Sequence, residues 1–105
     1  MEFSELLKFI EKEDQRLSQH YNLEKDKMIL ARTVKLTEEL GELCNEILIE
    51  SKLQRKDKLD NQEKDNLSSE FADVILCTLL LAKSMNVDIK TALDKKMEKI
   101  KKRNY

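Results

Sequence analysis

The stretch SSEFADVILCTLLLAKSM, residues 68–85, decides the fold of this chain. Nearly every residue from Phe71 to Ala82 is apolar, and the run contains no glycine or proline, so it predicts a helix. On a helical wheel these residues cover almost the full circle, which indicates a helix that is covered on all sides. Glu70 and Asp73 nevertheless lie at the start of the run and inside it. Because a carboxylate taken out of water costs several kcal/mol unless it is compensated, both acids need an explanation.

The composition of the whole chain favours helices. Its 105 residues include no proline, one glycine and 39% charged residues, which disfavours a turn-rich β architecture. We therefore predict an all-α fold, a four-helix bundle in a single domain that spans residues 1–105. Three other helices of a small chain can hardly cover the apolar helix alone, because a domain of this size builds only a modest core. We expect oligomerisation to complete the bundle.

Charge and cysteine content argue against several partners and compartments. The net charge of -1 gives no bulk attraction to nucleic acid or to an anionic membrane, and neither is expected as a partner. The apolar run is shorter than the roughly 20 residues that a membrane span requires. Cys44 and Cys77 lie among apolar residues and are expected to be buried, reduced thiols. The N-terminus lacks the apolar core of a signal peptide, so we expect a cytoplasmic protein.

Hydrophobic periodicity predicts the positions of the four helices. They are expected to run from about Glu2 to Gln19, from Leu23–Asp26 to Leu53, from Lys64 to Ser84 and from Ile89 to Arg103. The segment 54–66 is predicted to be a solvated connection, and Asp88 is the expected N-cap of the last helix. The core-facing residues of the second helix are expected to include Leu36, Leu40, Leu43 and Ile47, and those of the last helix Ile89, Leu93, Met97 and Ile100.

Two pairs of acids are spaced to meet between helices. Glu39 and Glu42 are three residues apart on the second expected helix, so they project from neighbouring parts of its surface. Glu70 and Asp73 have the same spacing on the third. Glu46 falls between the first two acids in angle, one turn further along. Two neighbouring helices can thus bring four carboxylates towards one point.

A cluster of this kind requires compensation, because like charges that lie close together repel one another. Ligation by oxygen alone selects hard ions, Mg²⁺ or Mn²⁺, and Mg²⁺ typically retains waters and binds substrate phosphates. The pattern therefore favours a metal-dependent site for phosphate chemistry. Two simpler interpretations remain open. Glu39 and Glu42 can belong to a solvated helix face, and the other two acids can form buried salt bridges to lysine.

The acids also carry a family resemblance. The segment EELGE, with Glu38, Glu39 and Glu42, is followed after 27 residues by EFAD, with Glu70 and Asp73. This pattern resembles the EExxE…ExxD signature of the MazG-like, all-α nucleoside triphosphate pyrophosphohydrolases. The segments KLTEELGELCNEI and EFADVILCTLLLA agree with the family, as does the lysine-rich last helix, and the resemblance covers residues 24–105.

The resemblance implies an activity and a set of residues. Members of the family bind Mg²⁺ and hydrolyse a nucleoside triphosphate to a monophosphate and pyrophosphate. They generally assemble as dimers or tetramers. The implied role is house-cleaning, the removal of non-standard or surplus (d)NTPs. By position, the metal ligands are Glu39, Glu42, Glu70 and Asp73, with Mn²⁺ as the substitute ion. Glu38 and Glu39 are the implied catalytic residues, with Glu38 in a supporting role that orients a ligand or a basic residue. Lys96 and Arg103, on one face of the last helix, are the implied phosphate-binding residues.

Departures from the family pattern keep other interpretations open. Cys77 and Ile100 stand where relatives often have a tyrosine and an asparagine that help hold sugar or base, so the preferred nucleotide is not predicted. His20 and Tyr21, at the first helix corner, are candidates for contact with a base, although packing is the simpler role. The alternative function is a catalytically weak helical oligomerisation or regulatory module. A di-iron bundle is excluded because it needs Glu-x-x-His pairs, and the single histidine has none.

Overall fold

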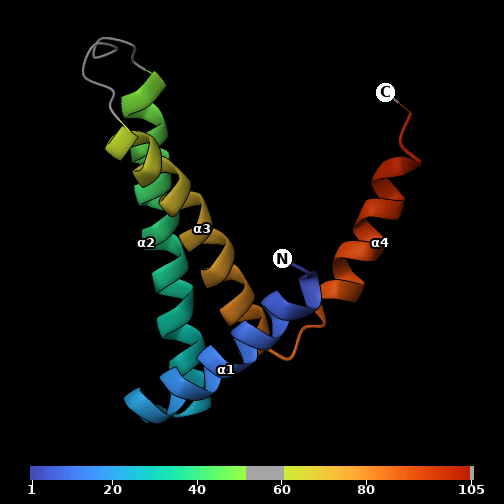
Figure 1. Ribbon diagram of the computed structural model, residues 1–105. Coiled ribbons are helices and arrows are strands. Elements are labelled where there is room, and N and C mark those ends of the chain that lie inside the picture. Colours follow the sequence, from blue (N-terminus) through green and yellow to red (C-terminus); the bar gives the residue numbers. More distant parts are fainter. Residues whose placement is uncertain (52–60, 105) are drawn as a thin grey trace.

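The computed structural model describes residues 1–51 and 61–104, with side chains from Asn66 onward in the second range. The described chain contains helices and no strands, so the predicted all-α fold is confirmed (Figure 1). The helices are α1 (Phe3–Tyr21), α2 (Lys25–Ser51), α3 (Asn61–Ser84) and α4 (Ile89–Lys101). The predicted connection 54–66 lies partly outside the described residues, and its last part belongs to α3, which begins at Asn61.

The helices form one long pair, one crossing helix and one arm. α2 and α3 lie side by side and run in opposite directions, and α1 crosses one end of this pair, where it contacts α3 (Figure 1). The turn after α1 depends on Asn22, which adopts a left-handed φ of 51° and donates its backbone N–H to Ser18 O at 2.9 Å. Asparagine tolerates this conformation better than most residues, so it ends α1 and redirects the chain into α2.

The turn before α4 is also encoded locally. Asn86 has a φ of 56°, and Asp88 caps the helix by accepting a hydrogen bond from Thr91 N at 3.1 Å. A second bond, from Thr91 Oγ1, reaches the other carboxylate oxygen at 2.9 Å. These two bonds hold the pKa of Asp88 below its usual value. The predicted N-cap is therefore confirmed, because a side-chain oxygen satisfies a backbone N–H that the first helical turn leaves free.

The seam between α2 and α3 is narrow and partly polar. The buried apolar residues are Ile10, Met28, Leu43 and Leu79, and Arg32 and Glu39 are buried with them. On α2 the buried positions lie four and seven residues apart, which is the spacing of one helix face. The prediction that Leu40 and Ile47 face this core is wrong, because their side chains are 49% and 37% exposed. The seam is rotated about 60° from the apolar stripe that was expected to form it, at 100° per residue.

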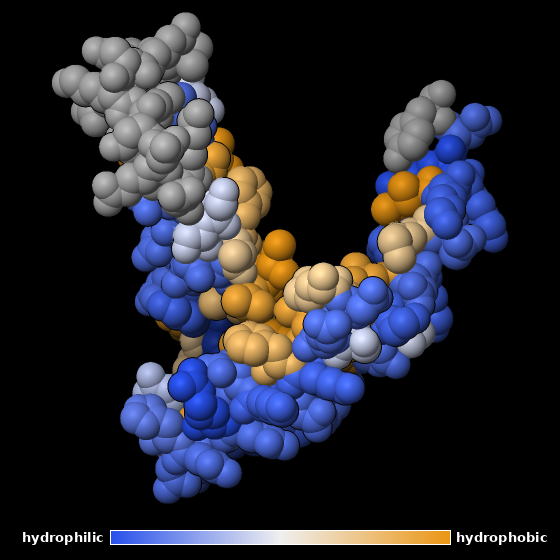
Figure 2. All heavy atoms as spheres, viewed as in Figure 1, coloured by the Kyte–Doolittle hydropathy of each residue, from blue (hydrophilic) through white to orange (hydrophobic). Residues whose placement is uncertain are grey.

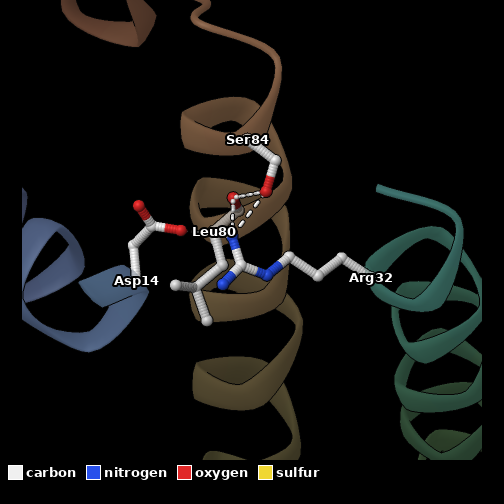
Figure 3. Close-up of polar contacts among 4 residues, drawn as sticks. All are labelled: Asp14, Arg32, Leu80 and Ser84. Carbon is white, nitrogen blue, oxygen red and sulfur yellow. Dashed lines mark hydrogen bonds and ion pairs between the residues drawn. The ribbon is translucent and has the colours of Figure 1, made fainter. Parts of the chain in front are cut away.

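A buried arginine ties three helices together at one end of this seam. Arg32 reaches from α2 across to α3, and its Nη1 donates to Leu80 O at 3.3 Å and to Ser84 Oγ (Figure 3). The same nitrogen meets Asp14 Oδ1 of α1 at 2.6 Å. The arginine side chain is only 9% exposed. Because the ion pair and the two oxygen acceptors compensate its burial, this network fixes how α1 sits on the helix pair.

α4 leads away from the other helices (Figure 1). All its residues from Lys90 onward are exposed, and the expected inner-face residues Leu93, Met97 and Ile100 are 42%, 51% and 43% exposed. The Cα radius of gyration is 16.9 Å. A compact domain of this length has a value of about 13 Å. The predicted inner face of α4 is therefore not buried in a single chain.

Apolar side chains are also exposed on the helix pair. Phe71 and Ile75 of α3 are 48% and 54% exposed, so a single chain does not cover this helix on all sides as expected. Figure 2 shows apolar side chains gathered on the concave side of the molecule, between the helix pair and α4. Both cysteines are free, but Cys44 is exposed rather than buried. Among the described helices, none combines the length and the apolar character needed to cross a membrane.

Candidate functional site

Three acids meet in the middle of the seam. Glu39 of α2 and Glu70 and Asp73 of α3 each place a carboxylate oxygen within 4.8 Å of the other two. Glu70 and Asp73 share one face of α3 because they are three residues apart, and Glu39 lies on the buried face of α2 opposite them. Glu39 is 7% exposed, and the other two acids are half-buried. The cluster thus combines acids from both helices in a partly dry place.

The protein's own groups compensate this cluster only in part. Lys35 Nζ lies 3.0 Å from Glu39 Oε1, which raises the pKa of the lysine. Among the described residues, Glu39 Oε2 and Glu70 Oε2 are buried without a hydrogen-bond partner. The pKa of Glu70 is raised by burial first, and then by the charges of neighbouring carboxylates. The alternative of lysine salt bridges at Glu70 and Asp73 is not supported, because among the described residues no ion pair involves either acid. The alternative of a solvated helix face applies to the exposed Glu42 but not to the buried Glu39.

The other acids of the motif lie around this centre. Glu42 and Glu46 are close enough for their charges to contribute to the raised pKa of Glu70. Glu42 is exposed and does not join the three-residue cluster, whereas Glu46 is half-buried. The angles explain this difference, because at 100° per residue Glu42 points about 60° away from Glu39 and Glu46 only about 20°. Glu38 is exposed.

The structure does not bring the predicted phosphate-binding residues to the acids. Lys96 and Arg103 lie on α4 and beyond its end, exposed, on the arm that leads away from the helix pair (Figure 1). In the described ranges, no ion pair joins either side chain to Glu39, Glu70 or Asp73. Within one chain, therefore, the acid cluster has Lys35 as its paired cation.

The residues present fit a divalent cation. Three carboxylates with a single lysine partner leave an excess of negative charge, and two of their buried oxygens lack a hydrogen bond. An unpaired buried polar atom costs free energy that a ligand recovers. Because the donors are all carboxylate oxygens, with no histidine or thiolate among them, the site suits a hard ion.

A pocket of about 340 Å³ opens on the same seam, beyond the acids. Its lining comes from three helices and the α1–α2 turn: Leu17, Tyr21, Leu23, Met28, Ala31, Arg32, Lys35, Cys77 and Leu80. Sequence reasoning missed this pocket and the roles of Arg32 and Lys35. A signal for both was present, since Lys35 and Arg32 precede Glu39 by four and seven residues and therefore share its helix face.

The fold and the acid cluster define a class of protein: helical proteins that present carboxylates from two antiparallel helices at one point. Residues 27–105 match the family model of the MazG nucleotide pyrophosphohydrolase domain, and the chain belongs to this family. The predicted resemblance is thereby confirmed. The chain is also 32% identical, over 75 residues, to the uncharacterized protein YpjD of Bacillus subtilis (strain 168). That match covers 71% of this chain and 66% of the relative, which is just under two thirds of its length. No solved structure matches the chain.

Proposed function

We propose that this protein is a divalent-metal-dependent nucleoside triphosphate pyrophosphohydrolase, which converts a (d)NTP to a (d)NMP and pyrophosphate. The observation that carries the proposal is the meeting of Glu39, Glu70 and Asp73, with two buried oxygens left unpaired. Membership of the nucleotide pyrophosphohydrolase family gives the reaction class. Mg²⁺ is the proposed ion, with Mn²⁺ as a substitute, because both accept ligation by oxygen alone.

The chain's own residues divide the work. Glu39, Glu70 and Asp73 hold the ion, and Glu42, beside them, is the proposed fourth ligand. When bound, such an ion offsets the charge of phosphate oxygens and acidifies water. Lys35 offsets part of the charge of Glu39 through the ion pair at 3.0 Å. Glu38, exposed at the position before Glu39, orients a ligand or a basic residue from outside the cluster.

We also propose that a second copy of the chain completes the site. The surface area is 8567 Å², whereas a compact monomer of 12.4 kDa exposes about 6100 Å². The excess lies partly on apolar side chains of α2, α3 and α4, and obligate dimers bury areas of this order. The basic α4 of one copy then packs against the acidic helix pair of the other. This arrangement brings Lys96 and Arg103 to the phosphates.

The function is tested by a panel of nucleoside triphosphates with Mg²⁺, in which monophosphate and pyrophosphate are both measured. Release of these two products locates the cleavage between the α and β phosphates. Glu39→Gln and Asp73→Asn are expected to lower kcat/KM about a hundredfold or more, since each removes charge stabilisation of several kcal/mol. Glu11→Gln is the matched control: it removes an exposed carboxylate of α1, and full activity is expected.

Three outcomes would revise the proposal. Activity retained in Glu39→Gln with an intact helical fold removes Glu39 from the site. Release of diphosphate and inorganic phosphate assigns a different reaction. No turnover of any nucleotide with Mg²⁺ or Mn²⁺ supports the alternative, a helical oligomerisation or regulatory module.

Subunit mixing tests the second copy. Glu39→Gln and Arg103→Ala are each expected to be inactive, and mixing them after partial unfolding and refolding should restore part of the turnover. Turnover is restored if α4 of one copy contributes Arg103 to the site formed by the acids of the other copy, because the mixed dimer then holds one intact site. Absence of restoration in a mixture shown to be dimeric assigns both residues to the same chain.

A further inference from the structure

The pocket beyond the acids has an unusual combination of walls. Most of its lining is apolar, from residues such as Leu17, Leu23, Met28 and Leu80. Arg32 and Lys35 are the charged lining residues, and of the two only Arg32 has a side chain that is more than nine-tenths buried. The pocket's volume of about 340 Å³ falls in the range of small-molecule sites, which are mostly apolar with a few polar groups that fix the ligand's orientation. The pocket therefore suits a flat, largely apolar ring that offers one polar edge.

Arg32 supplies the polar group of this pocket. Its Nη1 makes all the bonds of the network with Asp14, Leu80 O and Ser84. Its other terminal nitrogen, Nη2, is buried and has no hydrogen-bond partner among the described residues. An arginine can only donate hydrogen bonds, so the missing partner is an acceptor. A phosphate is disfavoured as that acceptor, because the pocket walls are apolar and the arginine's charge already meets that of Asp14.

We propose that this pocket binds the nucleobase and selects bases with a carbonyl oxygen at the edge opposite the sugar, namely 4-oxopyrimidines and 6-oxopurines. The inference rests on the proposed function, since it names the part of the substrate that lies outside the phosphate site. Nη2 of Arg32 donates to the carbonyl oxygen. Cytosine and adenine present an amino group at the same edge, which leaves donors facing donors and the arginine unpaired.

The position of the pocket agrees with a nucleotide bound along the seam. Arg32 precedes Glu39 by seven residues, about 10.5 Å along α2 at 1.5 Å per residue. Leu80 follows Asp73 by the same number on α3. Lys35 and Cys77 line the pocket at the level between them, where the sugar connects base and phosphates. Tyr21, which is 58% exposed, lies at the pocket with an aromatic face that can stack on a base.

Binding of nucleosides to the native protein tests this inference without turnover. Cys77 lines the pocket and Cys44 does not, so in a Cys44→Ser variant the alkylation of Cys77 reports occupancy by mass spectrometry. Uridine and cytidine have nearly the same shape and differ at the carbonyl edge. We expect uridine to protect Cys77 with an apparent affinity at least about tenfold higher than that of cytidine. Equal protection by the two nucleosides, or protection by neither, overturns the proposal.

Enzyme kinetics provide a second test of base selectivity. The ratios of kcat/KM for UTP over CTP and for ITP over ATP are expected to be about ten or more. Arg32→Lys keeps a cation beside Asp14 but removes the Nη2 donor, so both ratios should fall towards one while the far-ultraviolet circular dichroism remains helical. If this variant does not fold, the nucleoside experiment on Cys44→Ser decides.

The two proposals fail in different ways. If no nucleotide is hydrolysed, the proposed function is lost. If nucleotides are hydrolysed but UTP and CTP are used equally, and uridine and cytidine protect Cys77 equally, only the base pocket is lost. If the UTP/CTP and ITP/ATP ratios of kcat/KM persist in a folded Arg32→Lys variant, Arg32 does not determine base selectivity.

Discussion

The two ends of the α2–α3 seam treat buried charge in opposite ways. At one end Arg32 is balanced by Asp14 and by two further oxygens, so one terminal nitrogen is fully used. Seven residues further along α2, Glu39 faces two other acids and meets only Lys35, whose side chain is 58% exposed. A balanced buried charge holds a fold together, whereas an unbalanced one adds a cost that a ligand removes. The difference assigns a structural role to Nη1 of Arg32, whose other terminal nitrogen stays unpaired, and a metal-binding role to the acids.

Metal binding is expected to give the largest effect. Mg²⁺ at a hundredfold excess over its dissociation constant should raise the free energy of unfolding by about 2.7 kcal/mol. For a domain of this size, each kcal/mol raises Tm by about 4–8 °C. Asp73→Asn should abolish this shift, and Glu11→Gln should leave it unchanged. Thermal unfolding followed by circular dichroism measures the effect. The same shift of Tm in wild type and Asp73→Asn would show that the acid cluster is not the metal site.

Breaking the arginine network should come next in size. Asp14→Asn is expected to lower the free energy of unfolding by about 2 kcal/mol, because it weakens a charge-assisted hydrogen bond to a buried arginine. Glu13, the preceding residue, pairs with Arg16 on the surface, and Glu13→Gln should cost less than about 0.5 kcal/mol. Urea unfolding compares the two variants. Equal costs would show that burial does not distinguish these two ion pairs.

The sequence predicted the fold and the acids better than it predicted which faces are buried. Helix periodicity and the N-cap at Asp88 follow from local preferences, and they agree with the structure. The spacing of Glu70 and Asp73 is also local, whereas their meeting with Glu39 depends on how α2 packs against α3. The predicted core face of α2 is wrong because its most apolar stripe does not face α3. The side that faces α3 instead carries Arg32, whose partners come from α1 and α3.

Other features lay beyond what a pattern of residues can give. The pocket needs walls from three helices, and no spacing within one helix specifies such a cavity. The direction of α4 could not be predicted either, because an apolar stripe on a helix does not specify which surface it packs against. The apolar stripes of α2 and α4 are partly exposed in a single chain, and the proposed second copy would cover them.

The pH dependence of stability sharpens the comparison at Glu70. Its raised pKa means that the folded protein keeps a proton that the unfolded chain releases near the ordinary glutamate pKa of 4.5. The metal-free fold is therefore penalised above the raised pKa, and the penalty disappears as pH falls below that of the unfolded group. Glu70→Gln should stabilise the metal-free protein at about pH 8, with no gain left near about pH 4. Urea unfolding at both pH values measures this difference. A gain that does not depend on pH would contradict it.

The smallest expected effect concerns Lys35, which is the cation paired with the cluster. Lys35→Gln removes a positive charge that competes with a bound metal. Mg²⁺ affinity should therefore rise by about fivefold at ordinary ionic strength, since a divalent and a single charge about 5 Å apart interact by about 1 kcal/mol in a wet, screened environment. The free energy of unfolding of the metal-free protein should fall by less than about 1 kcal/mol, because the lysine is largely exposed.

Lys90→Gln is the matched control, since Lys90 pairs with Asp94 at the same helical spacing, at 2.8 Å, but far from the acids. Isothermal titration at low and high salt separates the two variants, because screening reduces the effect of Lys35→Gln. A weaker affinity in Lys35→Gln than in Lys90→Gln would mean that Lys35 orients Glu39 for the ion more than it competes with it.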